Sequence, residues 1–204
     1  MKSGILFAGA LVLALGMSVA QAAGDAKAGQ TKSAVCAACH GMDGNSNGPE
    51  WPSLAGQHES YIVKQLKAFK SGQRNNPLMT PQAQVLNDQD MEDVSAYFSA
   101  QKIKGGEAEP SKVATGQQIY QGGVASNKVT ACLACHGPDG RGNAPAGYPS
   151  LRGQRSAYVV LQLQSYKNGS RTTDKSQGNI MQMEAAKLTD DQIKAVAAYI
   201  QGLR

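Results

Sequence analysis

The sequence predicts an all-α protein made of two tandem copies of one small domain. The first observation is a repeated nonapeptide, CAACHGMDG from residue 36 and CLACHGPDG from residue 132, whose two copies contain all four cysteines of the chain. The second observation is that the following segments also match in pairs. The third is that apolar residues recur at helical spacing in each copy, while no alternating run is long enough for a convincing strand.

The matched blocks are separated by insertions that behave like loop insertions. The offset between the copies, meaning the difference in residue number between matched positions, is 87 at Gly29 and Gly116 and 96 at the cysteine motifs. It is 97 at Tyr61 and Tyr158, and 102 near the chain end. Because surface loops tolerate insertions better than the elements they connect, this pattern indicates two homologous units.

The domain boundaries follow from these blocks. We expect an N-terminal domain at residues 23–104, a polar linker bearing Gly and Glu at 105–109, and a C-terminal domain at 110–204. A single merged domain is the alternative.

The first 22 residues have the pattern of a secretory signal peptide. Lys2 supplies a positive start, an apolar run follows, and Ala20-Gln21-Ala22 matches a cleavage signal. The apolar run is shorter than the roughly 20 residues of a membrane-spanning helix, so cleavage is favoured over a retained anchor. We therefore expect export to the periplasm.

Helix boundaries can be read in both copies. The stretches 61–70 and 158–167 predict middle helices, and Gly72 and Gly169 follow them as helix-ending residues. The last helix of each copy should begin with a capping box, formed by Asn87 with Asp90 and by Thr189 with Gln192.

Gly29 and Gly116 occupy the same point of the repeat, inside short N-terminal helices. Glycine costs about 1 kcal/mol there relative to alanine. We expect each to allow a close crossing with the last helix, where Tyr97 or Tyr199 would lie over the gap. The alternative is an ordinary weak helix position.

Each cysteine motif is Cys-x-x-Cys-His, the pattern of covalent haem attachment, in which two thiols add to the haem vinyl groups and the imidazole binds iron. Disulfides, a thioredoxin-like redox pair and a zinc site are the alternatives. No β-rich segment surrounds the motifs, and His58 is the only other histidine. We predict two haem c groups, attached at Cys36, Cys39, Cys132 and Cys135, with iron bound by His40 and His136.

A second axial ligand decides whether each iron is closed or open to a reactant. Met79 and Met181 align at the offset of 102, and each follows an apolar residue in a loop before the last helix. A thioether is a soft ligand that raises the reduction potential. Met183 is the competitor of Met181. His58 is matched by Arg155, so we expect it to be a surface residue rather than a ligand.

The segments WPSL and YPSL follow the two motifs at equivalent positions. A ligating imidazole usually donates its other N–H to a carbonyl or carboxylate, which fixes its tautomer. The carbonyls of Pro52 and Pro149 are the candidates for this acceptor. A plain proline turn is the alternative.

Together these features resemble the dihaem cytochrome c4 family. The resemblance rests on two Cys-x-x-Cys-His domains of class I cytochrome c type, the segments PSLAGQ and PSLRGQ, the middle helices and the methionine loops, and it covers essentially the whole mature chain. It implies two cytochrome c domains related by a pseudo-twofold axis, each enclosing a covalent haem c. It also implies that His40 and Met79 ligate one iron, and His136 and Met181 the other.

The same resemblance implies a periplasmic electron carrier rather than an enzyme. It would pass electrons from the quinol-oxidising complex side of a respiratory chain toward a terminal oxidase, as a monomer that is soluble or loosely membrane-associated, without a nucleic-acid partner. The alternatives are a dihaem redox enzyme, such as a peroxidase or a sulfur-oxyanion dehydrogenase, and a fixed cytochrome subunit of a larger complex. Such enzymes need an open iron position, which two methionine-capped irons do not leave.

Charge is distributed unequally between the two halves. Residues 23–104 contain eight basic and eight acidic residues, whereas residues 110–204 contain eleven basic and five acidic ones. This surplus favours steering toward an acidic partner or an anionic membrane face, although it could simply aid solubility. Because positive charge disfavours ferric iron, we also predict the higher reduction potential for the second haem.

Overall fold

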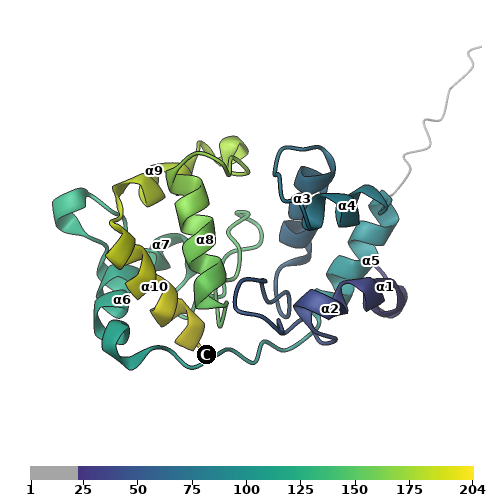
Figure 1. The fold of residues 1–204 in the computed structure, drawn as a ribbon, viewed down its shortest axis with the longest axis horizontal. Helices are drawn as coiled ribbons and strands as arrows, with labels where there is room; N and C mark the ends of the chain where they lie inside the picture. Colours follow the sequence, from purple (N-terminus) through teal and green to yellow (C-terminus); the bar gives the residue numbers. More distant parts are fainter. Residues whose placement is uncertain (1–22) are drawn as a thin grey trace, which may run out of the picture.

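The computed structural model describes residues 23–204, and the predicted signal peptide at 1–22 lies outside the described residues. The described chain forms two helical domains side by side, with the segment that joins them running along the lower edge of the view in Figure 1. Extended pairing in this part of the chain is limited to isolated bridges, which confirms the all-α prediction. No described helix is long and apolar enough to cross a membrane.

The first domain packs its helices around the last of them. Its elements are α1 (Ala26–Lys32), η1 (Ser33–Val35), α2 (Ala37–His40), α3 (Glu59–Lys70), α4 (Met79–Gln84) and α5 (Asp88–Ser99). Helices α1 and α3 pack against α5, and α4 packs against α3. Between them lies an apolar core that includes Phe69, Met91 and Phe98.

The second domain repeats this arrangement. Its elements are α6 (Pro110–Gly122), η2 (Ala125–Asn127), α7 (Leu133–His136), α8 (Ser156–Lys167), η3 (Lys175–Gln177), α9 (Ile180–Lys187) and α10 (Asp190–Gly202). Helices α6 and α8 pack against α10, and α9 packs against α8, as their counterparts do in the first domain. The core includes Tyr120, Ile193 and Val196.

The predicted helix boundaries agree closely with the structure. The middle helices α3 and α8 end where expected and begin two residues earlier than predicted. Gly72 and Gly169 follow them with φ of 75° and 76°, a left-handed conformation in which glycine avoids the cost of a Cβ. Both predicted capping boxes are present, at Asn87 and at Thr189.

The close helix crossing predicted at the two glycines is confirmed. A Cβ atom at Gly29 would overlap the carbonyl oxygen of Asp93 and lie 2.9 Å from the Cβ of Tyr97. A Cβ atom at Gly116 would overlap the Ala195 carbonyl oxygen and lie 2.7 Å from the Tyr199 Cβ. Glycine is therefore required because another backbone passes at this point, which offsets its low helix propensity.

The two domains meet through reciprocal hydrogen bonds, as expected for a pseudo-twofold relation. The Gln57 side chain accepts from the Ser150 N–H and donates to the Ser150 carbonyl, both at 2.9 Å. The Gln154 side chain makes the same pair of bonds with the Ser53 backbone, at 2.8 and 2.9 Å. Gln57 and Gln154 are buried, so each amide replaces hydrogen bonds that it would otherwise make with water.

The segment between the domains is fastened to the end of α10. The Gly106 N–H donates to the Gln201 carbonyl at 3.1 Å, and the Gln201 side chain donates to the Glu107 carbonyl at 2.5 Å. Helix α6 then begins at Pro110, whose fixed φ suits the first helical position.

Candidate cofactor sites

Both Cys-x-x-Cys-His motifs form a single helical turn. Cys36 and Cys132 stand at the N-caps of α2 and α7, and each histidine ends its turn. The four thiols are half-buried, and none is joined in a disulfide. Burial raises the pKa of Cys36 and raises that of Cys132 to about 11. A raised pKa is the opposite of the lowered one that activates the nucleophilic thiol of a Cys-x-x-Cys redox pair.

Each motif histidine is held by one ring nitrogen. His40 Nδ1 lies 2.8 Å from the Pro52 carbonyl oxygen, and His136 Nδ1 lies 2.9 Å from that of Pro149. The predicted acceptors are thus confirmed. Burial lowers the pKa of both imidazoles and so favours the neutral ring, and the carbonyl acceptor places its proton on Nδ1. The lone pair of Nε2 is then free to bind a metal.

Backbone hydrogen bonds to two glycines hold the segments WPSL and YPSL against the cysteine motifs. The Gly44 carbonyl accepts from the N–H groups of Leu54 and Ala55 at 2.7 and 3.0 Å. The Gly140 carbonyl does the same for Leu151 and Arg152, at 2.7 and 3.0 Å. These bonds fix the chain just after each proline, and so determine where the ring-orienting carbonyl lies.

The two candidate distal methionines lie in the first turns of short helices. The expectation that they lie in a loop is therefore wrong: Met79 begins α4, and Met181 is the second residue of α9. Polar side chains cap these turns. Asn76 Oδ1 accepts from the Met79 N–H at 2.9 Å, and Asp174 Oδ2 accepts from the Gln182 N–H at 3.1 Å. Such caps satisfy backbone donors that would otherwise lack partners, which allows helices this short.

Burial separates these methionines from most others. Met79 packs on the core cluster of the first domain together with Cys36, and Met181 is half-buried. The competitor Met183 is 53 % exposed and Met42 is 70 % exposed, whereas Met91 is fully buried in the core.

Two buried arginines link the domains, and the sequence analysis did not identify them. Arg74 donates to Gln65 at 2.8 Å and to Gln162 at 2.7 Å, and Arg171 donates to the same two acceptors at 3.2 and 2.7 Å. Each guanidinium also reaches a tyrosine hydroxyl of the other domain, Tyr158 at 3.1 Å and Tyr61 at 2.8 Å. The available signal was that both arginines end the matched middle blocks at the offset of 97.

The residues of each half fit haem c. Each half offers two thiols one helical turn apart, an imidazole whose Nδ1 is already engaged, and a half-buried methionine in the first turn of a short helix. In addition, neither Arg74 nor Arg171 is paired with a carboxylate in the described part of the chain, although each is at most 9 % exposed. Buried positive charge is costly without a counter-charge, and haem c carries two propionate carboxylates that could supply one.

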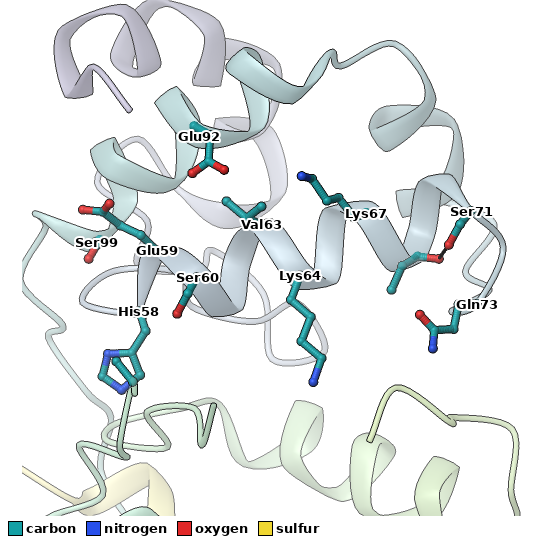
Figure 2. A pocket seen from close by; sticks show the side chains of 12 residues that line it. His58, Glu59, Ser60, Val63, Lys64, Lys67, Ser71, Gln73, Glu92 and Ser99 are labelled. Carbon is teal, nitrogen blue, oxygen red and sulfur yellow. Dashed lines mark hydrogen bonds between the residues drawn. The ribbon is translucent and has the colours of Figure 1, made fainter. Parts of the chain in front are cut away.

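An open groove of about 940 Å³ lies away from both motifs. It is lined by α3, by residues of α5 and by Ala144 of the second domain. Figure 2 shows Lys64 extending from α3 toward that domain, where its Nζ donates to Gln177 at 3.3 Å. The lining residues are mostly polar or charged, with a few apolar ones, and include neither cysteine nor methionine, so the groove is distinct from the cofactor sites.

His58 lies at the edge of this groove, and its prediction as a surface residue is only partly right. The side chain is half-buried, and its Nε2 is buried without a hydrogen-bond partner in the described residues. His58 and its counterpart Arg155 each follow a glutamine that bridges the interface, and Arg155 donates to the Ser46 carbonyl of the other domain. Domain contact therefore covers positions that look exposed in one copy alone.

Known proteins resemble this chain over nearly its whole length. The family model for cytochrome c matches residues 26–102 and again 113–204. Cytochrome c4 of Pseudomonas aeruginosa is 48 % identical over 194 residues, which cover 95 % of this chain and 96 % of that protein. The crystal structure of reduced cytochrome c4 from Pseudomonas stutzeri superposes with a TM-score of 0.86 at 46 % identity, covering 89 % of this chain and 100 % of the other.

A more distant relative is named for a specific redox partner. The thiosulfate dehydrogenase electron acceptor of Stutzerimonas stutzeri is 35 % identical over 170 residues, covering 81 % of this chain and 77 % of that protein.

Both halves therefore have the construction of a c-type cytochrome, and the chain is a protein with two covalent haem c groups. It belongs to the cytochrome c4 family, whose members are dihaem electron carriers. The two attachment motifs contain Cys36 with Cys39 and Cys132 with Cys135, one pair in each domain.

Proposed function

We propose that this protein carries electrons between redox proteins and has no substrate of its own. In this proposal each iron is closed on both faces, by His40 and Met79 in one domain and by His136 and Met181 in the other. The thioether anchors are Cys36, Cys39, Cys132 and Cys135. The observation that carries the proposal is that each domain pairs a carbonyl-fixed imidazole with a methionine in the first turn of a short helix.

The chain keeps electron exchange free of proton and ligand exchange. Haem c, when bound, supplies an iron that accepts and returns one electron. The Pro52 and Pro149 carbonyls hold the histidine protons on Nδ1, so Nε2 is available as a ligand in both oxidation states. A thioether carries no proton and binds ferrous iron well, which favours the reduced state. Little rearrangement is then needed when the electron arrives.

We further propose a place for this carrier in the cell. The protein is exported by the segment 1–22, works in the periplasm as a monomer, and takes electrons from the quinol-oxidising complex side toward a terminal oxidase. Its domains extend over residues 23–104 and 110–204, joined by 105–109. The similarity to cytochrome c4 proteins over both halves supports this proposal, and the basic second domain suits an acidic redox partner or an anionic membrane face.

A second donor deserves a test because of the relative from Stutzerimonas stutzeri. Its name assigns it electrons from a thiosulfate dehydrogenase. A sulfur-oxidising dehydrogenase is therefore the alternative electron source. A dihaem enzyme would instead need one iron without its methionine.

The test replaces single methionines and records the ferric spectrum. Met79→Leu and Met181→Leu should each remove half of the methionine-to-iron charge-transfer band and leave one haem high-spin, because leucine offers no ligand atom. Met42→Leu and Met183→Leu are matched controls, since both side chains are largely exposed, and should leave the spectrum unchanged. A high-spin haem in the unmodified protein would contradict the carrier function and favour an enzyme.

A further inference from the structure

The second domain contains a turn that the first domain lacks. The offset between the copies rises from 87 to 96 just before the second cysteine motif. The added residues form a tight turn in which Val124 and Val129 exchange backbone hydrogen bonds, both at 3.0 Å. Within this turn Lys128 adopts a left-handed conformation, with φ of 55°. The turn leads through Thr130 directly into Cys132.

This turn is bonded to α9, the helix that carries Met181. The carboxylate of Glu184 accepts from the Thr130 N–H at 2.9 Å and from the Thr130 hydroxyl at 3.2 Å. Lys187 donates to Glu184 at 2.9 Å and to the Lys128 carbonyl at 3.0 Å. The Asn127 side chain adds a bond to the Lys187 carbonyl at 3.2 Å. We call Thr130, Glu184, Lys187 and the Lys128 carbonyl the clasp.

The charge in the clasp strengthens these bonds. Burial opposes ionisation of Glu184, but the Lys187 ammonium and the Thr130 donors outweigh it and hold the pKa of Glu184 below its ordinary value. Hydrogen bonds to an ionised acceptor are stronger than neutral ones. The Glu184 side chain is 23 % exposed, so solvent weakens them only in part.

The first domain has no counterpart of the clasp. The positions that match Thr130, Glu184 and Lys187 are Ala34, Gln82 and Val85. All three are exposed, and the Gln82 side chain makes no hydrogen bond in the described part of the chain. One contact at the end of these helices is common to both domains. A lysine donates to the carbonyl of the leucine that follows α4 or α9: Lys70 to Leu86 and Lys167 to Leu188.

The position of Glu184 in α9 matters for Met181. Residues three apart lie on one face of a helix, so fixing Glu184 fixes the face that presents Met181. The other end of the clasp is two residues from Cys132. The clasp therefore ties the chain that bears the distal methionine to the chain that enters the haem attachment motif.

We propose that Glu184 is a positioning residue that keeps Met181 on the iron of the second haem, and that the clasp makes this methionine less readily displaced than Met79. This inference rests on the proposed function, because it takes Met181 as the distal ligand. The inference goes further, because naming Met181 as the ligand does not say how firmly this methionine is held on the iron.

The experiment measures how readily cyanide displaces each methionine from ferric iron. Glu184→Ala should raise the cyanide association constant of one haem roughly tenfold, the factor that corresponds to losing a charge-assisted hydrogen bond, and leave the other haem unchanged. Thr130→Val removes the hydroxyl but keeps the backbone donor, so it should produce a smaller rise at the same haem. Gln82→Ala is the matched control in the first domain and should change neither haem.

Three further measurements keep the outcomes distinct. Mass spectrometry and circular dichroism establish that each variant carries two haems and is folded. In the reduced unmodified protein, two shifted methionine methyl proton signals test the ligand set. Fewer than two signals would overturn the ligand assignment and the clasp together. Two signals, with the same cyanide affinities in Glu184→Ala as in the unmodified protein, would overturn the clasp alone.

Discussion

In the first domain the crossing of α1 and α5 encloses an ion pair, whereas the equivalent crossing of α6 and α10 in the second domain is apolar. Asp93 is 3 % exposed and accepts from the Asp25 N–H at 2.9 Å and from the Lys32 ammonium at 2.6 Å. The matching residue in α10 is Ala195, which is part of the apolar core. The same helix geometry is thus stabilised by charge in one copy and by apolar packing in the other.

The two domains also differ in how they hold the chain after the motif histidine. In the first, Tyr97 of α5 donates to the Met42 carbonyl at 2.7 Å. In the second, Tyr120 of α6 donates to the Gly137 carbonyl at 2.7 Å. Tyr120 is fully buried and burial raises its pKa, whereas Tyr97 is half-buried.

This comparison teaches that the two copies share the residues that hold the cofactor but differ in their supports, by which we mean the contacts that stabilise the surrounding helices. Both copies have the thiol pair, the imidazole, the proline carbonyl and the crossing glycine. These supports are the Lys32–Asp93 ion pair in the first domain, the clasp in the second, and tyrosines at different positions in the two domains. Substitutions in the supports should therefore affect one domain and spare the other.

The largest expected effect comes from the crossing glycines. Gly29→Ala and Gly116→Ala should each destabilise their own domain by about 3 kcal/mol, because the added methyl group would overlap a backbone carbonyl that cannot move away cheaply. Chemical unfolding of the holoprotein measures this. Gly122→Ala is the control, since its Cβ would meet nothing within 4 Å, and it should not destabilise. Equal stability of Gly122→Ala and Gly116→Ala would refute the close crossing.

A smaller effect should distinguish the domains in acid. The Lys32 ammonium, together with the Asp25 N–H, lowers the pKa of Asp93 from 3.8 to about 2. A depressed carboxyl pKa gives stability that is present above pH 4 and lost as the pH falls toward 2. We expect the free energy of unfolding of the first domain to fall by about 1–2 kcal/mol. This is less than the pKa shift alone would give, because Lys32 is one-third exposed and solvent screens the pair.

Amide hydrogen exchange, corrected for intrinsic rates, should show this loss between pH 4 and pH 2 in α1 and α5 but not in α6 and α10. Asp93→Asn should remove most of this difference between the domains. The same acid sensitivity in both domains would show that the ion pair does not set it.

The two tyrosines should give effects of the same size or smaller. Tyr120→Phe should destabilise the second domain by about 1–2 kcal/mol, because it leaves the Gly137 carbonyl without its buried donor. Tyr97→Phe should cost the first domain about 0.5 kcal/mol, since water can replace the hydroxyl at a half-buried site. Thermal unfolding of the two variants compares them. A larger loss of stability for Tyr97→Phe than for Tyr120→Phe would contradict the greater weight that we give to the buried Tyr120 hydrogen bond.

Much of the fold and of the cofactor chemistry could be predicted because it depends on local signals. The capping boxes at Asn87 and Thr189 and the terminating glycines act within one helical turn. The proline carbonyls could be proposed because a ligating imidazole needs an acceptor and the repeat offered one at the same place twice.

The remaining features depend on contacts between distant segments. Arg74 and Arg171 matched in the repeat, but each also bonds a neutral partner in the opposite domain, Gln162 for Arg74 and Gln65 for Arg171, which no local pattern reveals. His58 appeared exposed for the same reason. Met79 and Met181 were expected in loops because α4 and α9 are too short to show helical periodicity and rely on side-chain caps from Asn76 and Asp174.

The most direct test of the central claim, that both irons are closed by histidine and methionine, is a spectroelectrochemical titration of the purified protein. We predict two one-electron steps, with both haems low-spin in both oxidation states. The second-domain haem should have the higher potential by on the order of 50 mV at low salt, owing to its surplus of positive charge. A haem that is high-spin in either state would contradict the claim.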